Sequence, residues 1–398
     1  MSRLLALLLV LAVTATRADP INDAVVAGPR VGAFLASLWP DAQKRGVTRA
    51  TFELALAGFT PDPRVIAATH SEPEYVKPVG AYLDAVVSRS RIATGAAKAA
   101  QWSAVLDRIE QQYGVERWIV LALWGIESSF GAGQDRWDVI RSLATLAEAH
   151  YRDPLFRDEL LVALSILQEG HVARERMLGS WAGAMGQPQF LPSSFYRYAV
   201  DFSGDGKRNI WTDVPDVLAS MANYLARSGW RRGLPWGFEV VLPRGFDYRR
   251  SHGSFTEWSA LGLKRADGGA FPREGDAFIL FPSGAAGPAF LVTENFNVIK
   301  LYNNSDVYAL AAGSLADRMH GAPPFRTPWP ANDPQLSRDA RMALQHKLVA
   351  LGYKVNDFAG RLDFAQRDMI REQQVRFGMV PDGQPTLALL QRLGIAPR

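Results

Sequence analysis

The hydrophobic pattern of the chain centres on residues 118–131, which read WIVLALWGIESSFG. The first nine of them, 118–126, carry no charge, and Glu127 follows directly. A helix that is apolar on every side must be enclosed by the rest of its domain. The pattern therefore predicts a buried helix that ends near Glu127, just before a Ser-Ser-Phe-Gly turn.

A carboxyl group in that position is unusual. Burial disfavours its ionised form, and the negative end of the helix dipole acts in the same direction. A Glu that keeps its proton near neutral pH can serve as a general acid. Glu127 is therefore a candidate catalytic acid. The alternative is a helix-terminal Glu paired with an Arg.

Most of the chain before residue 236 has helical patterning. Helices are predicted within residues 19–60, 72–87, 98–113, 140–148, 155–169 and 216–228. Residues 179–211 differ, because they are rich in Gly, Pro, Ser and aromatic residues. A long irregular stretch inside a compact domain is usually functional.

The best strand candidates lie between residues 236 and 300, in FEVVLP, AFILFP and AFLVTENFNVI. A helix over residues 301–319 follows. Residues 321–334 contain five prolines, which predicts a stiff linker, long enough for the parts on either side to move independently. Three helical pieces from residue 336 onward predict a small C-terminal module. The expected fold class is mainly α, with a small inserted β element.

Composition limits the classes of function. A chain of 398 residues favours two domains, and 48% hydrophobic with 21% charged residues is ordinary globular material. The net charge is +4, and its basic residues are dispersed, so we expect no nucleic-acid partner. The six histidines show no metal-ligand spacing, and there is neither a phosphate-binding Gly-rich loop nor a G-x-S-x-G motif.

The N-terminus resembles a secretory signal peptide. Arg3 precedes an apolar run, residues 4–13, and small residues follow. The run is too short to span a membrane, and we expect cleavage after Ala18. With no cysteine in the chain, disulfides and a lipid-modified N-terminal cysteine are excluded. We expect a soluble protein of a bacterial periplasm.

Several motifs together resemble the B-type lytic murein transglycosylases. WGIESSFG and GSWAGAMGQPQFLPSSF carry the resemblance, and LAGFTPDPRVI, RSLATLA, DFSGDGKRNIW, NYLARSGW and LYNNSDVYALA match in the same order. The match covers roughly residues 28–320. The tail resembles a peptidoglycan-binding domain, with Gly352–Tyr353, Pro381–Asp382–Gly383 and Pro385–Thr386 at its motif positions. The expected domains are a signal peptide (1–18), a catalytic domain (19–320), a linker (321–334) and a peptidoglycan-binding domain (335–398).

The resemblance implies a lysozyme-like helical fold and cleavage of the β-1,4 bond between N-acetylmuramic acid and N-acetylglucosamine. The family cleaves without water and leaves a 1,6-anhydro end. Glu127 matches its sole catalytic acid and base, whereas ordinary glycosidases need two carboxylates. The next acids, Asp135 and Asp138, are interpreted as solvated surface residues. The alternatives are a hydrolytic muramidase and a non-catalytic peptidoglycan-binding scaffold.

Three polar residues match positions that the family places in its substrate cleft or beside it. Ser180 and Gln189 could bind acetamido and hydroxyl groups, or else bond to their own loop backbone. Arg152 falls where the family has a basic residue, although Tyr151 stands where relatives often carry a second Arg. The alternative for Arg152 is a surface residue.

The aromatic candidates follow the same logic. Tyr302, Asn303 and Tyr308 match a family segment that contacts substrate, and Asn303 suits an acetamido group. The alternative for the two tyrosines is core packing. Phe190 and Trp181 could stack on sugars or pack in the core.

The segment DFSGDGKRNIW has the spacing of an EF-hand-like loop. Position twelve is Thr212 rather than Glu, and the family closes this calcium loop with a more distant Asp. The predicted ligands of a structural Ca²⁺ are Asp201, Ser203, Asp205, the carbonyl of Lys207, and Asp216, with Asn209 as a further candidate. The alternative is a plain Asp/Gly turn. The chemistry itself requires no cofactor. The expected partners are peptidoglycan glycan strands and cell-wall synthesis proteins, and the protein is expected to be a monomer.

Overall fold

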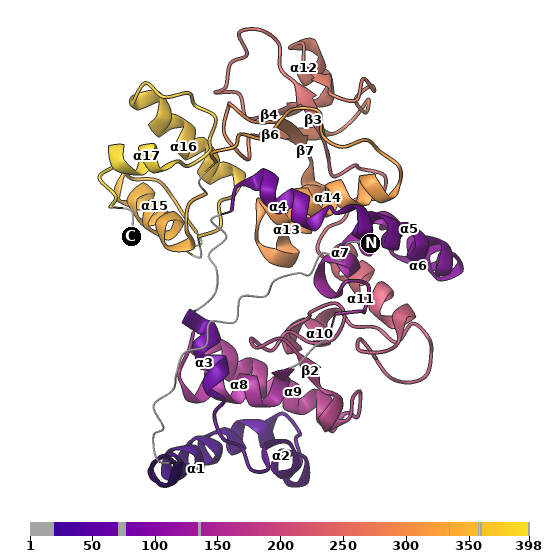
Figure 1. The fold of residues 1–398 in the computed structure, drawn as a ribbon, viewed down its shortest axis with the longest axis vertical. Coiled ribbons are helices and arrows are strands. Elements are labelled where there is room, and N and C mark those ends of the chain that lie inside the picture. Colours follow the sequence, from indigo (N-terminus) through magenta and orange to yellow (C-terminus); the bar gives the residue numbers. More distant parts are fainter. Residues whose placement is uncertain are drawn as a thin grey trace, which may run out of the picture.

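The computed structural model describes residues 20–70, 77–133, 137–333, 335–356, 358 and 360–396, so the predicted signal peptide and Asp135 lie outside the described residues. The fold is mainly helical, as predicted (Figure 1). None of the helices it describes is long and apolar enough to cross a bilayer. The helices are α1 (Pro20–Lys44), α2 (Arg49–Leu56), α3 (Pro63–His70), α4 (Val79–Val86), α5 (Arg89–Gln101), α6 (Ser103–Tyr113), α7 (Arg117–Ser128), α8 (Val139–Glu148), α9 (Leu155–Gln168), η1 (Arg174–Arg176, a 3₁₀ turn), α10 (Pro192–Tyr198), α11 (Val214–Arg227), α12 (Phe255–Ala260), α13 (Glu294–Asn303), α14 (Asp306–Met319), α15 (Arg338–Ala350), α16 (Phe364–Arg376) and α17 (Leu387–Arg392).

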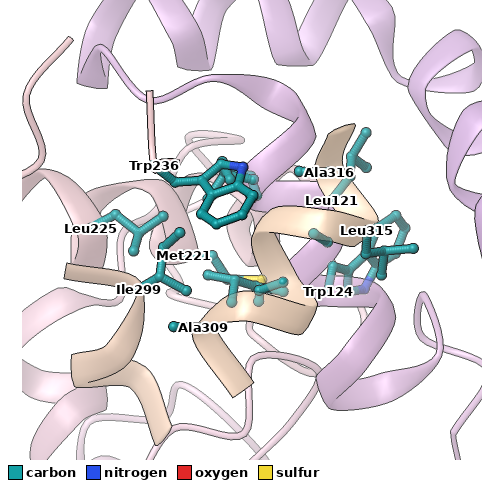
Figure 2. Close-up of a cluster of buried hydrophobic side chains, with 14 of the residues drawn as sticks. Leu121, Trp124, Met221, Leu225, Trp236, Ile299, Ala309, Leu315 and Ala316 are labelled. Carbon is teal, nitrogen blue, oxygen red and sulfur yellow. The ribbon is translucent and has the colours of Figure 1, made fainter. Parts of the chain in front are cut away.

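Helix α7 carries the apolar segment that the sequence singles out. Residues 119–125 are all buried, and the helix packs against α5, α6, α11 and α14. Figure 2 shows side chains of this first core, including Leu121 and Trp124 of α7, gathered around α14. Enclosure of α7 on all sides is what its uncharged sequence requires.

A second core lies among α1, α2, α8, α9 and α10, the part drawn at the bottom of Figure 1. Tyr224 of α11 and Tyr302 of α13 pack against both cores. These two tyrosines therefore mark the junction at which the two halves of the main region, residues 20–320, meet.

Two predicted helices are broken in the structure. The helix expected over residues 98–113 divides at Trp102, where α5 ends and α6 begins. The helix expected over residues 301–319 was also wrong, because Asn304 adopts a left-handed conformation (φ 58°) and Ser305 caps a new helix, α14. The irregular stretch 179–211 contains one short helix, α10.

The strands are β1 (Trp137–Asp138), β2 (Leu178–Gly179), β3 (Gly237–Val241), β4 (His252–Ser254), β5 (Lys264–Arg265), β6 (Asp276–Leu280) and β7 (Ala289–Val292). The inserted β element is a five-stranded antiparallel sheet with strand order β4-β6-β7-β3-β5. Its third predicted strand is shorter than expected, because the Thr293 side chain accepts a hydrogen bond from the Asn295 amide (3.1 Å) and starts α13. A separate two-stranded ribbon joins β1 and β2.

The proline-rich segment is fixed to the sheet rather than free. The Glu239 carboxylate of β3 accepts hydrogen bonds from the amides of Arg326 and Thr327, each 2.8 Å long. Trp329 stacks over Phe290 of β7 with ring centroids 6.1 Å apart. These contacts differ from the independent movement expected of a linker.

The C-terminal module, residues 335–396, has its own apolar core and docks beside the sheet (Figure 1). Phe364 of α16 stacks on Phe278 of β6 at 4.2 Å and 8°. Arg371 donates a hydrogen bond to the Ile279 carbonyl (3.3 Å), and Asp382 accepts one from the Ala285 amide (2.8 Å).

Candidate active site

Glu127 lies in the last turn of α7, on the way out of the first core. Ser129 ends the helix in a left-handed conformation (φ 50°), and Phe130 continues it (φ 59°). The ring of Phe130 meets Trp124 edge-on at 5.5 Å, which folds the turn back over the helix. The apolar helix thus delivers a carboxylate to its end and leaves part of Glu127 accessible.

The Glu127 carboxylate has a phenol as its partner. The Tyr308 hydroxyl donates a hydrogen bond to Glu127 Oε1, and no described Arg or Lys forms an ion pair with this Glu. Burial raises the pKa of Glu127 to about 7, against the lowering effect of the Tyr308 hydrogen bond. The alternative in which an Arg neutralises this Glu is therefore not what the described residues show.

Two predicted tyrosines surround the acid. Tyr308 is buried in α14, and Tyr302 is half-buried and donates a hydrogen bond to the Pro188 carbonyl (2.7 Å). Burial, followed by the nearby Glu127 charge, raises the pKa of both phenols well above the usual value. Both tyrosines therefore stay protonated and remain hydrogen-bond donors near the acid.

The rings around Tyr302 form a continuous aromatic cluster. Its centroid lies 4.8 Å from that of Tyr224 and 6.0 Å from that of Phe190, and Tyr198 lies 4.6 Å from Tyr224. Phe190 is buried, so it packs in the core. The cluster fixes the loop after β2 against α11 and α13.

Ser180 and Gln189 make the local backbone contacts considered as their alternative. Ser180 Oγ accepts a hydrogen bond from the Ala184 amide (3.1 Å), and Gln189 Nε2 donates to the Gly186 carbonyl (2.8 Å). Gln189 also has a positive φ of 53°. Their contact with substrate stays a prediction.

Gln187 is a residue that the sequence reasoning missed. Its side-chain oxygen accepts a hydrogen bond from the Trp124 indole (2.7 Å), and its amide group donates to the Trp211 carbonyl (2.9 Å). Gln187 thereby joins the irregular loop to Trp124 of α7, a residue close to Glu127 in sequence. Gln187 and Gln189 stand two positions apart in the sequence. No pattern there shows which glutamine would contact substrate and which would hold the loop to α7.

Tyr308 lines a cavity of about 1270 Å³. Glu127 is not among the residues that line this cavity, and the hydrogen bond from Tyr308 joins it to the cavity wall. The predicted residues Arg152 and Asn303 also line the cavity, and Trp181 does so too. Further lining residues, which the sequence did not single out, are Tyr82 of α4 and, from the C-terminal module, Arg338, Arg341, Arg361 and Arg367.

The Asp138 carboxylate caps a helix and forms an ion pair. Its carboxylate accepts a hydrogen bond from the Arg141 amide (3.0 Å) as the cap of α8 and pairs with Arg174 (2.8 Å). It therefore caps α8 and pairs with Arg174, and its side chain remains 37% exposed.

The predicted calcium loop is closed by its own amides. Asp201 accepts hydrogen bonds from the amides of Gly204, Asp205 and Gly206. Asp216 is buried and accepts bonds from the amides of Phe202, Ser203 and Asn209. The Asp205 carboxylate accepts one from the Lys207 amide (2.8 Å).

Within the described residues, no three His, Cys, Asp or Glu side chains come close enough to hold one ion. Three backbone amides already engage the Asp216 carboxylate in this arrangement of the loop. Calcium binding stays a prediction of the sequence.

Comparison with known proteins gives a consistent result. A family model described as Transglycosylase SLT domain matches residues 30–317, and one described as Putative peptidoglycan binding domain matches residues 337–393. SltB3 from Pseudomonas aeruginosa, solved in complex with NAG-anhNAM-pentapeptide, is 44% identical with a TM-score of 0.82, over 92% of this chain and 99% of that one. The Escherichia coli lytic transglycosylase Slt35, solved in complex with calcium, is 26% identical with a TM-score of 0.61, over 73% of this chain and 93% of that one.

Among curated proteins, membrane-bound lytic murein transglycosylase B of Escherichia coli (strain K12) is 33% identical over 221 residues. The match covers 54% of this chain and 60% of that protein, so this chain spans about three-fifths of the relative's length.

Proposed function

Because the chain belongs to the B-type lytic transglycosylase family and carries a peptidoglycan-binding domain, we propose that it cleaves the β-1,4 bond between N-acetylmuramic acid and N-acetylglucosamine in peptidoglycan. The products are a free N-acetylglucosamine end and a 1,6-anhydro-muramoyl end. One observation carries this proposal: Glu127 ends a buried helix, accepts a hydrogen bond from the buried Tyr308, and has its pKa raised to about 7.

In the first half of the reaction Glu127 acts as a general acid. Near neutral pH a large fraction of its carboxyl group still holds a proton, which it gives to the glycosidic oxygen as the bond from that oxygen to C1 breaks. The substrate's own acetamido group stabilises the positive charge that develops at C1. Tyr308 stabilises the carboxylate that remains, because its hydroxyl donates to Glu127 Oε1.

In the second half the same carboxylate acts as a base. It removes the proton from the 6-hydroxyl of the muramoyl residue while that oxygen forms its bond to C1, and the acid is restored. An internal nucleophile of this kind has an effective molarity of about 10⁵ M or more, so it outcompetes water. The capping role of Asp138 supports a mechanism with one carboxylate rather than two.

Substrate contacts are proposed for residues that line the cavity or adjoin it. Asn303 and Arg152 present polar groups to the space that Tyr308 faces, and Trp181 offers an apolar ring. We propose that Tyr302 stabilises the surroundings of the Glu127 carboxylate and does not stack on a sugar ring. Ser180 and Gln189 are proposed to contribute to the cleft by stabilising the loop that carries them.

We also propose that the protein works in the periplasm as a monomer, on glycan strands, with cell-wall synthesis proteins as further partners. The signal-like sequence of residues 1–18 supports export. Cell fractionation with an antibody against the full chain tests this placement.

The test of the activity is mass spectrometry of the products released from purified sacculi. We expect anhydro ends from the wild type and from Glu175→Gln, which alters an exposed acid. We expect no turnover from Glu127→Gln, with sacculus binding unchanged. Reducing ends would instead identify a hydrolytic muramidase, and binding without any product would identify a scaffold.

A further inference from the structure

Asp306, the first residue of α14, is held by two cations from different parts of the molecule. Its side chain is 13% exposed and pairs with Lys300 of α13 (2.7 Å) and with Arg367 of α16. Burial alone would raise the pKa of Asp306, but the two cations outweigh burial and lower it to about 2. The carboxylate is therefore charged at any pH at which the enzyme works, and it needs both partners.

The same helical turn holds the partner of the acid. Ser305 caps α14 by accepting a hydrogen bond from the Tyr308 amide (3.3 Å), and the Tyr308 hydroxyl reaches Glu127. Asp306 and Tyr308 lie two residues apart in this turn. A change in the position of this turn would therefore move the phenol whose hydrogen bond lowers the pKa of Glu127.

Arg367 itself is fixed within the C-terminal module. Its other guanidinium nitrogen donates to the Gly383 carbonyl (3.1 Å) and to the Gln384 side chain (3.0 Å), and the residue is 6% exposed. The module in turn is held to the sheet through Phe364 and Arg371. A continuous set of contacts thus joins the docked module to the catalytic carboxylate.

From this geometry we propose that Arg367 of the peptidoglycan-binding module is a positioning residue for catalysis, which acts through Asp306 to hold Tyr308 against Glu127. The inference rests on the proposed function. It implies that the module contributes to the chemical step, and not only to attachment to the polymer.

Arg152, Arg338, Arg341 and Arg361 line the same cavity as Tyr308, but the groups that act most strongly on these atoms are closer. Glu127 faces the phenols of Tyr308 and Tyr302, and Tyr308 also faces Tyr82. Asp306 faces Lys300 and Arg367. Because the Tyr308 hydrogen bond lowers the pKa of Glu127, loosening it raises that pKa. The alkaline limb of the kcat/KM profile, which reports the essential acid of the free enzyme, then moves to higher pH.

The test measures kcat/KM and kcat against pH for the full chain on purified sacculi. In Arg367→Gln we expect the alkaline limb to move up by about half a pH unit, and kcat to fall several-fold, since one hydrogen bond is worth a fraction of a pKa unit to about one unit. In a Tyr308→Phe background the same substitution should leave the limb where Tyr308→Phe alone puts it. Asp306→Asn should move the limb in the same direction, and it carries the test should Arg367→Gln fail to fold.

The matched control is Arg376→Gln, an exposed Arg of the same helix that neither holds the module to the sheet nor acts on Asp306. It should leave the limb in place. The proposal is overturned by an unchanged limb in folded Arg367→Gln and Asp306→Asn, by shifts that add in the Tyr308→Phe background, or by an equal shift in Arg376→Gln. Turnover by Glu127→Gln would remove the proposed function as well, whereas its loss together with an unchanged limb would remove this inference alone.

Discussion

Tyr308 and Glu127 lie 181 residues apart in the chain, and a hydrogen bond from the phenol to the carboxylate joins them between α14 and α7. The bond opposes the effect of burial on Glu127. Burial and this hydrogen bond therefore act on the pKa of Glu127 in opposite directions, and each can be changed separately.

Removal of the phenol should raise the pKa of Glu127 further. In Tyr308→Phe, we expect the alkaline limb of kcat/KM to move up from about 7 by between half and one pH unit. We also expect kcat to fall about tenfold, because the carboxylate formed on proton transfer loses a donor. Tyr248→Phe, which changes a tyrosine packed against a separate core beside the sheet, is the control. A limb at the wild-type pH in Tyr308→Phe would contradict this account.

The raised pKa of Glu127 should also appear in folding stability. Its folded pKa of about 7 exceeds the usual value of 4.5, so the native state binds more protons than the unfolded state between those pH values. Ionised Glu127 thus weakens the fold as pH rises from 4.5 through 7. We expect Glu127→Gln to be more stable than the wild type at pH 8, by about 3 kcal/mol, and to lose that advantage near pH 4.5.

Urea unfolding of both proteins at the two pH values measures this difference. Glu175→Gln, at an exposed position, should show no comparable change with pH. An advantage of Glu127→Gln that is the same at pH 4.5 and pH 8 would argue against a proton retained on the native carboxyl.

The close packing of the last turn of α7 gives a stability prediction. A Cβ at Gly125 would lie 2.5 Å from the Phe130 ring, so Gly125→Ala must displace either the ring or the turn. We expect a loss of about 1 to 3 kcal/mol, together with lower kcat, because Glu127 lies two residues further on. Gly32→Ala, in α1 with open space around it, should cost nothing or stabilise slightly. Thermal unfolding of both variants compares them directly, and equal midpoints would count against the predicted clash.

Asp216 should stabilise the 201–216 loop even when no metal is bound. Asn in its place keeps one acceptor oxygen but replaces the other with a donor that faces an amide. In Asp216→Asn we expect a loss of about 1 to 3 kcal/mol in EDTA. A calcium site in this loop would add a second effect: a midpoint that rises with Ca²⁺ in the wild type, and that no longer rises in Asp201→Asn.

The sequence predicted the elements that depend on local pattern. The nine uncharged residues before Glu127 require an enclosing core, and that core is present around α7. The strand after residue 289 and the helix after residue 301 were misjudged, because single caps, Thr293 and Ser305, end one element and start the next. The apolar pattern continues across caps of this kind, so the pattern alone does not show where one element ends and the next begins.

The candidate site was predictable only in part. Glu127 and Tyr308 were found separately, but the sequence cannot show that a phenol rather than an Arg meets the carboxylate. The docking of the C-terminal module depends on contacts such as Phe364 on Phe278, which join residues with no shared motif. A proline-rich connection predicts stiffness, but nothing in it shows that Glu239 holds its backbone to the sheet.

The stacking of Phe364 on Phe278 affects how shortened forms of this enzyme behave. A form that ends near residue 320 would leave an aromatic face of β6 in water, and Asp306 would keep a single cation. Such a truncated enzyme should aggregate more readily and turn over more slowly even on small soluble muropeptides, for which attachment to a polymer is irrelevant. Slow turnover by a truncation therefore reports a damaged reaction centre as well as a missing anchor.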